Sequence, residues 1–162
     1  VGIGMLSSCI YHTFPSSEVD FVDLDGDVVE IARDSFCLPQ PENHNYYVMD
    51  AIQFVYETVE TYDFIMIDVY DGNFVPEPFT EKKFIQQLHN IMNVGGLAEY
   101  NVYNGGSNAK HVKENLIRDG VSVFQKAEYL NTAALKRLKE SKKIPDLDPY
   151  PNNDVFYMVK RQ

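Results

Sequence analysis

The sequence is short of positive charge. Against 24 Asp and Glu residues it has 14 Lys and Arg residues, which gives a formal net charge of −10. A protein that follows nucleic-acid phosphates needs a basic stripe, and no cluster here offsets the acid excess. The nearest one, KRLKESKK at 136–143, is typical of the solvated face of a helix. We therefore predict no nucleic-acid partner.

Long apolar runs and metal-binding patterns are missing as well. No window reaches the roughly 20 apolar residues that cross a bilayer, so we expect no membrane partner. The only two cysteines, Cys9 and Cys37, show no close-spaced metal or redox pattern, which favours a packing role in a reducing cytoplasm. The histidines stand far apart in the sequence, so we predict no metal site.

What the chain does contain is an alternation of short apolar runs and amphipathic stretches. Its 162 residues, 44% of them hydrophobic, suffice for one domain with a sizeable core. The alternation is typical of βαβ units and predicts a single α/β domain with a mostly parallel sheet. The predicted strands are 19–24, 46–49, 63–68, 97–102, 121–130 and 155–160, and the predicted helices are 5–14, 27–37, 51–60, 80–93, 108–119 and 132–142.

The helix predicted at 80–93 carries its own start and stop signals. Thr80 is a suitable N-cap, because its hydroxyl can accept a hydrogen bond from an amide of the first turn. Asn93, followed by Gly95 and Gly96, is a typical C-terminal signal. We therefore expect the helix to run between these residues.

The chain opens on VGIGMLSS, a glycine turn that normally follows a strand, of which one residue remains. We therefore expect a fragment of a longer protein. Gly2 and Gly4 allow the backbone to approach a ligand, and the next helix presents its amides there. Asp23 stands nineteen residues after Gly4, at the end of a strand, where an acid suits ribose hydroxyls. The pattern favours ligand binding, while Asp25 and Asp27 are interpreted as N-terminal capping residues.

Carboxylates also follow the next two predicted strands. Asp50 can read an adenine amino group or cap the helix that begins near Ala51, and the two roles are compatible. Asp68 ends the apolar run DFIMID, and Asp71 lies three residues further, in the loop above the sheet. Two acids aimed at one crevice attract cations, which suits holding an amine or taking a proton from one. The structural alternative is an Asx turn into Gly72.

Tyr150 precedes Pro151 in an extended turn, and either faces the same crevice or packs in the core. Together these elements resemble the class I S-adenosylmethionine-dependent methyltransferase fold, and within it the spermidine synthase-like proteins, over nearly the whole chain. The D-x-x-D of DVYD with the following P-x-x-F-T is the most specific match, and YPNNDVFYMVK is similar to the family's Y-P tail. The resemblance implies a Rossmann-like, doubly wound sheet with a C-terminal antiparallel strand, lacking most of its first strand here.

The resemblance also implies two sets of site residues. One set binds the donor, S-adenosylmethionine or its decarboxylated form, without a metal. The other binds an amine acceptor, and Asp68 corresponds to the acid that helps deprotonate it. The donor set consists of Gly2, Gly4, Asp23, Asp50 and Ala51, and the amine set consists of Asp71, Tyr70 and Tyr150.

One departure from the family concerns the donor. The family usually reads G-G-G-D-G at the glycine turn, with an aspartate that holds the aminopropyl ammonium, whereas this chain reads GIGMLS, so both donors stay open. We predict aminopropyl transfer to an amine, as in polyamine biosynthesis, because the D-x-x-D and the Y-P tail occur together. The alternatives are an S-adenosylmethionine-dependent methyltransferase and a non-catalytic cofactor-binding or dimerisation domain. A homodimer is also open.

Overall fold

The chain divides into two compact units, Val1–Glu57 and Thr58–Gln162, and each is described by itself. No helix in the described part of the chain is long and apolar enough to span a bilayer. Gly2, Gly4, Tyr150 and the helix predicted at 132–142 lie outside this part. The computed structural model describes residues 5–36, 38–124, 127–130 and 153–161.

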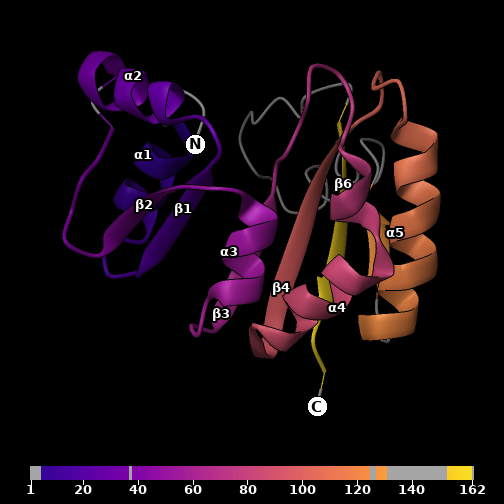
Figure 1. Ribbon diagram of the computed structural model, residues 1–162. Coiled ribbons are helices and arrows are strands. Elements are labelled where there is room, and N and C mark those ends of the chain that lie inside the picture. The colour runs from indigo at the N-terminus through magenta and orange to yellow at the C-terminus, as the bar shows by residue number, and fades with distance from the viewer. Residues whose placement is uncertain (1–4, 37, 125–126, 131–152, 162) are drawn as a thin grey trace, which may run out of the picture. The chain divides into compact units, whose positions relative to one another are not determined.

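The first unit, indigo to purple in Figure 1, contains a pair of parallel strands with three helices. Strand β1 (Val19–Asp23) pairs with β2 (His44–Val48) over its full length. Its apolar centre is aromatic, because the rings of Phe21 and Tyr46 stack with centroids 5.0 Å apart. The helices are α1 (Met5–Thr13), α2 (Gly26–Phe36) and α3 (Ala51–Glu57).

The second unit is a four-stranded sheet in the order β3-β4-β6-β5. Strands β3 and β4 are parallel, while β6 runs antiparallel to both β4 and β5. The predicted C-terminal antiparallel strand is therefore confirmed. The elements are β3 (Tyr62–Ile67), the 3-10 helix η1 (Glu77–Thr80), α4 (Lys82–Asn90), β4 (Met92–Tyr103), α5 (Ala109–Phe124), β5 (Ala127–Leu130) and β6 (Asn153–Val159).

Side chains alternate between the two faces of this sheet along β4. Ala98, Tyr100 and Val102 are buried on one face, where α4 and α5 pack (Figure 1), and the Tyr100 hydroxyl donates to the Phe79 carbonyl at 2.9 Å. The residues between them, including Glu99, are half-buried on the other face. Period-two alternation is what a sheet with one well-covered face requires. The buried face and its helices contribute Phe84, Ile85, Leu88, Val112, Leu116, Phe124, Phe156 and Met158 to the core.

The strand predicted at 121–130 is wrong in its first part. Helix α5 continues to Phe124, and β5 begins only at Ala127. Val112, Leu116 and Phe124 are buried at multiples of four residues, so the apolar face of the helix extends through the segment that reads as a strand. Helical packing against the sheet therefore outweighs the β-propensity of this valine-rich stretch.

Thr80 does not cap α4. It is the last residue of η1, and its hydroxyl donates to the carbonyl of Glu77 at 3.0 Å. The N-cap position belongs to Glu81, whose side chain makes no capping bond. Pro76 and Pro78 fix a tight turn immediately before the helix, and this turn takes Thr80 into the core, where it is buried.

Helix α4 also ends before its predicted stop. Its C-cap is Ile91, whose carbonyl accepts a hydrogen bond from the Tyr62 amide at 2.8 Å. The helix thus ends where the Ile91 backbone pairs with the start of β3. Asn93, Gly95 and Gly96, which were expected to close the helix, lie in β4 instead, and Gly95 has a φ of 87° there.

Candidate functional site

In the first unit, two of the predicted donor-binding acids lie at one edge of the strand pair. Asp23 is the last residue of β1 and is paired with Val48, the last residue of β2. The Met49 amide donates to the Asp23 carbonyl at 2.9 Å, which extends this pairing toward Asp50. The carboxyl edge of parallel strands is where open α/β folds bind ligands. The unit therefore brings Asp23 and Asp50 to the edge where the sequence places them.

A chain of local hydrogen bonds orders the loop after β1. The Asp23 Oδ1 accepts from the Asp25 amide at 3.1 Å, and the Asp25 Oδ1 accepts from the Asp27 amide at 2.9 Å. Asp25 stands immediately before α2, and Asp27 lies in the first turn of that helix. The predicted capping role is confirmed for Asp25, while Asp27 supplies the acidic side chain of the first turn, where the helix dipole favours it.

Asp50 caps α3, as the structural alternative predicts. Its Oδ1 accepts from the Ile52 amide at 2.7 Å, and its carbonyl accepts from the Phe54 amide at 2.9 Å. Ala51 is the first residue of the helix. The Asp50 side chain is exposed, so the cap leaves carboxylate surface open to a ligand. Two carboxylates fit the hydroxyl and amino donors of a nucleoside, so these residues fit the implied donor group.

In the second unit, Asp68 stands directly after β3 at the same kind of edge. The Asn101 side chain, which belongs to β4, donates through Nδ2 to the Asp68 Oδ1 at 2.9 Å. The β3–β4 register pairs Ile67 with Tyr100, so the next residue on each strand faces the other. Asp68 is exposed, and one oxygen is thus held by a side-chain amide while the carboxylate stays accessible from solvent.

Asp71 begins a tight turn three residues after Asp68. The backbones of Asp71 and Phe74 exchange two hydrogen bonds of 2.9 and 3.2 Å, and Gly72 has a φ of 59°, which favours glycine. Backbone pairing closes this turn, and the Asx turn named as the structural alternative, which needs the Asp71 side chain, stays a prediction. Both Asp71 and Phe74 are exposed.

Tyr70 lies between the two acids but its hydroxyl bonds to the protein backbone. It donates to the Asn101 carbonyl at 2.7 Å and accepts from the Tyr103 amide at 2.7 Å. Burial raises the pKa of the Tyr70 phenol; the Tyr103 hydrogen bond acts in the opposite direction, and the charge of Asp68 raises it further. The phenol therefore keeps its proton at neutral pH. A direct contact between Tyr70 and substrate stays a prediction.

Two residues of this region were not found by sequence reasoning. Asn101 holds Asp68, and Glu99 lies two residues before it on the same face of β4. Burial raises the pKa of the Glu99 carboxyl, and the nearby charge of Asp68 raises it further. Neither residue carries a motif signal, although the β3–β4 pairing register would have placed both beside Asp68.

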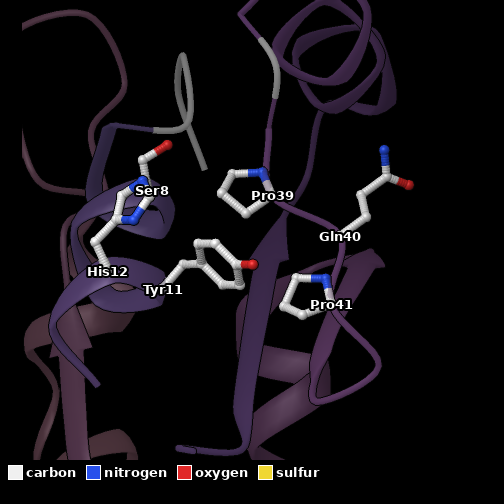
Figure 2. A pocket seen from close by; sticks show the side chains of 6 residues that line it. All are labelled: Ser8, Tyr11, His12, Pro39, Gln40 and Pro41. Carbon is white, nitrogen blue, oxygen red and sulfur yellow. The ribbon is translucent and has the colours of Figure 1, made fainter. Parts of the chain in front are cut away.

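A cavity of about 380 Å³ lies elsewhere in the first unit. Figure 2 shows the Tyr11 ring reaching from α1 toward two prolines of the segment before β2. That segment enters β2 at its amino end, whereas Asp23 and Asp50 lie at the carboxyl edge, so the cavity does not coincide with the predicted site. Its walls are Ser8, Tyr11, His12, Pro39, Gln40 and Pro41. Within the described residues, no three His, Cys, Asp or Glu side chains are grouped as metal ligands.

Solved structures share this arrangement of elements. A probable spermidine synthase from Corynebacterium glutamicum superposes with a TM-score of 0.76 at 21% identity, over 98% of this chain and 53% of that one. Human methyltransferase-like protein 13 superposes with a TM-score of 0.75 at 20% identity, over 99% of this chain and 69% of that one. The fold is thus the α/β Rossmann-like methyltransferase fold, a mixed sheet with an antiparallel C-terminal strand.

The family can be stated more narrowly. Residues 4–144 match the spermine/spermidine synthase domain, and the chain belongs to that family. It is 34% identical over 107 residues to the eEF1A lysine and N-terminal methyltransferase of Xenopus laevis, covering 60% of this chain and 15% of that protein. It is 23% identical over 151 residues to the polyamine aminopropyltransferase of Neisseria meningitidis serogroup A, covering 91% of this chain and 57% of that protein. The chain therefore spans less than two thirds of both relatives.

Proposed function

We propose that the protein transfers a group from an S-adenosylmethionine-type sulfonium donor to an amine nitrogen. The first candidate is aminopropyl transfer from decarboxylated S-adenosylmethionine to an amine acceptor. The observation that carries the proposal is the Asp68 carboxylate, exposed at the carboxyl edge of β3 and held by Asn101 at 2.9 Å. A general base must be within hydrogen-bond reach of the proton that it removes, and an exposed carboxylate at this edge can meet that requirement.

The group passes directly from donor to acceptor, so the protein itself forms no covalent bond with either. The amine nitrogen attacks the carbon bound to the sulfonium, a C–N bond forms, and the C–S bond breaks with its electron pair going to sulfur. The sulfur becomes a neutral thioether. Because the acceptor arrives as an ammonium ion, the Asp68 carboxylate must take one proton from its nitrogen before the attack, which frees the lone pair that forms the C–N bond. Catalysis then consists mainly of alignment and proton removal, which fits a site made of a base and an exposed acidic turn.

The acceptor is a cation when it arrives, and the acids around Asp68 suit it. Asp71 is exposed at the start of its turn, and Glu99 lies on the same sheet face as Asp68. Negative potential at the surface raises the local concentration of an ammonium ion. We assign Asp71 to anchoring the acceptor and Asp68 to deprotonating it.

On the donor side, the proposal uses Asp23 and Asp50. Asp23 is oriented by the Asp25 amide, and Asp50 is oriented by its cap on α3. Carboxylates fixed in this way accept hydrogen bonds from ribose hydroxyls and an adenine amino group without further ordering cost. The bound sulfonium supplies the electrophilic carbon, and the protein residues orient it.

Methyl transfer to an amine is the second candidate. Two observations favour it: the glycine turn has no aspartate to hold an aminopropyl ammonium, and a 34% identical relative is a lysine and N-terminal methyltransferase. Both candidates place an amine before the same base and differ in the carbon that is attacked. The D-x-x-D of DVYD, the motif by which the chain most resembles the spermidine synthase-like proteins, keeps aminopropyl transfer first.

Asp68→Asn tests the division of roles. The amide keeps the shape of the side chain but cannot take the proton, so turnover should fall by about 10²- to 10⁴-fold while donor affinity stays within about twofold. Turnover with each donor and an amine acceptor gives the first quantity, and calorimetric titration of the donor gives the second.

Two matched variants sharpen this test. Asp63→Asn removes a carboxylate at the other end of β3 and should leave turnover largely intact. Asp23→Ala should weaken donor binding instead. Equal loss of donor affinity in Asp68→Asn and Asp23→Ala would show that the two acids are not divided between base and donor binding.

A further inference from the structure

The β3–β4 ladder ends where the candidate site begins, at Ile67 paired with Tyr100. Strand β4 continues for three more residues and remains paired with β6 on its other side, through Asn101 with Val155 and Tyr103 with Asn153. The carbonyl of a strand residue and the amide two residues later point to the same side. The Asn101 carbonyl and the Tyr103 amide therefore both face the side that β3 has left.

The Tyr70 hydroxyl lies beside the Asn101 carbonyl and the Tyr103 amide, where a neighbouring strand would otherwise pair. One oxygen atom donates to the Asn101 carbonyl and accepts from the Tyr103 amide, each at 2.7 Å. In a regular ladder a neighbouring strand would supply both partners. The side chain of a loop residue thus replaces a strand residue, and it ties the loop between Asp68 and Asp71 to the end of β4.

Asn101 joins the two parts of this arrangement. Its backbone carbonyl accepts a hydrogen bond from the Tyr70 hydroxyl, and its side-chain amide donates one to the Asp68 Oδ1. The position of the base and the position of the loop thus depend on the same residue of a well-paired strand. Loops positioned by a rigid scaffold commonly carry catalytic groups, and a small displacement of such a group costs rate rather than binding.

We propose that Tyr70 is a positioning residue, whose hydroxyl fixes the loop carrying Asp68 and Asp71 to β4 and so sets the alignment of the base with the acceptor amine. The proposal deepens the proposed function and rests on it. The single hydroxyl proton is already donated to the Asn101 carbonyl. Tyr70 therefore acts through Asp68 and Asp71, in place of the direct substrate contact that the family resemblance implies.

Tyr70→Phe is the direct test, because it removes one oxygen and keeps the ring. The Tyr103 amide loses its acceptor, so its hydrogen exchange should accelerate by about tenfold. The side-chain amide signals of Asn101 should shift in the NMR spectrum, because this group reports the position of the Asp68 carboxylate. We expect kcat to fall by about tenfold, with the acceptor KM and the donor Kd within about twofold.

Tyr103→Phe is the matched control. It removes a hydroxyl from the neighbouring tyrosine, whose ring is exposed, and keeps the backbone amide that Tyr70 engages. Exchange at residue 103, the Asn101 signals and kcat should all stay close to those of the unaltered protein. Thermal unfolding of both variants verifies that each remains folded.

The outcomes separate this inference from the proposed function. Unchanged exchange at Tyr103 and unchanged Asn101 signals in Tyr70→Phe would overturn the inference, whether or not the protein is active. A raised acceptor KM with unchanged kcat would also overturn it, because that result means direct substrate contact. If the unaltered protein shows no transfer with either donor, the proposed function fails, while exchange and NMR signals still decide whether Tyr70 positions Asp68.

Discussion

At the scale of single residues, Asp50 shows how one side chain can serve both the fold and a ligand. Its Oδ1 accepts from the Ile52 amide at 2.7 Å and so satisfies one of the free donors at the start of α3. The helix has seven residues, too few to be stable without its cap and its packing. The same acid lies at the edge where the donor is proposed to bind.

Asp50→Ala should therefore destabilise the protein by about 1 kcal/mol, the usual cost of losing an N-cap acceptor. Urea unfolding followed by circular dichroism measures the loss. Asp50→Asn is the control, because its amide oxygen still accepts from the Ile52 amide and should retain most of the stability. If both variants were equally unstable, the capping bond would not be the cause.

Sequence reasoning succeeded for residues whose partners are close in the chain. The caps made by Asp25 and Asp50 reach amides two residues away, so residue type and position are enough to predict them. Asp68 and Asn101 are 33 residues apart, and only the β3–β4 register brings them together. The sequence therefore points to Asp68 as a candidate base, but not to Asn101, which holds it.

At the scale of elements, α5 shows why a local pattern can mislead. Its last turns read as a strand because of two valines, yet the helix continues through them to Phe124. Gly120 lies where the helix packs closely on β6, since a β-carbon there would stand 3.0 Å from both the Met158 sulfur and the Phe156 ring. Packing against Phe156 and Met158, which come much later in the chain, favours the helix, and local propensity does not record it.

Gly120→Ala should destabilise the second unit, although alanine favours helix by about 1 kcal/mol over glycine. The added methyl group forces Met158 and Phe156 to move, and overpacking of this kind costs about 1–3 kcal/mol. Thermal and urea unfolding should show the loss. Val121→Ala, at an exposed position of the same helix, should leave stability unchanged or slightly higher. Equal or greater stability in Gly120→Ala would contradict the close packing of α5 on β6.

At the scale of the whole molecule, the carboxyl group of Glu99 makes the stability of the folded protein depend on pH. Burial, together with the charge of Asp68, raises the pKa of Glu99 in the folded protein. Between the ordinary glutamate pKa, about 4.3, and this raised value, the folded state binds more protons than the unfolded state. The contribution of Glu99 to stability is therefore greatest at low pH and is lost as pH rises through that window.

Glu99→Gln should remove the loss of stability that the ionised Glu99 carboxylate causes as pH rises. Relative to the unaltered protein, the variant should gain stability as pH rises from about 4 toward neutrality, and the gain should level off above the raised pKa. Melting temperatures across this range measure it, with Glu114→Gln on the exposed surface of α5 as the control. A gain that shrinks with rising pH would mean that the Glu99 pKa is not raised.

The two units carry complementary parts of the proposed chemistry, donor-binding acids in the first and the base with its loop in the second. The alternation of elements and the antiparallel last strand were predictable from the sequence, because they depend on apolar period and family pattern. The ends of the elements were less predictable from the sequence, as Thr80 and Ile91 show, because strand pairing and proline turns determine where a helix begins and ends. Which group is transferred depends on the donor.

Calorimetric titration of the protein with decarboxylated S-adenosylmethionine and, separately, with S-adenosylmethionine is the most direct test of whether the protein binds a sulfonium donor. We predict that the decarboxylated donor binds more tightly, and that Asp23→Ala weakens its binding. Tighter binding of S-adenosylmethionine would place methyl transfer ahead of aminopropyl transfer. Binding of neither donor to the folded protein would contradict the account of a sulfonium-dependent transferase.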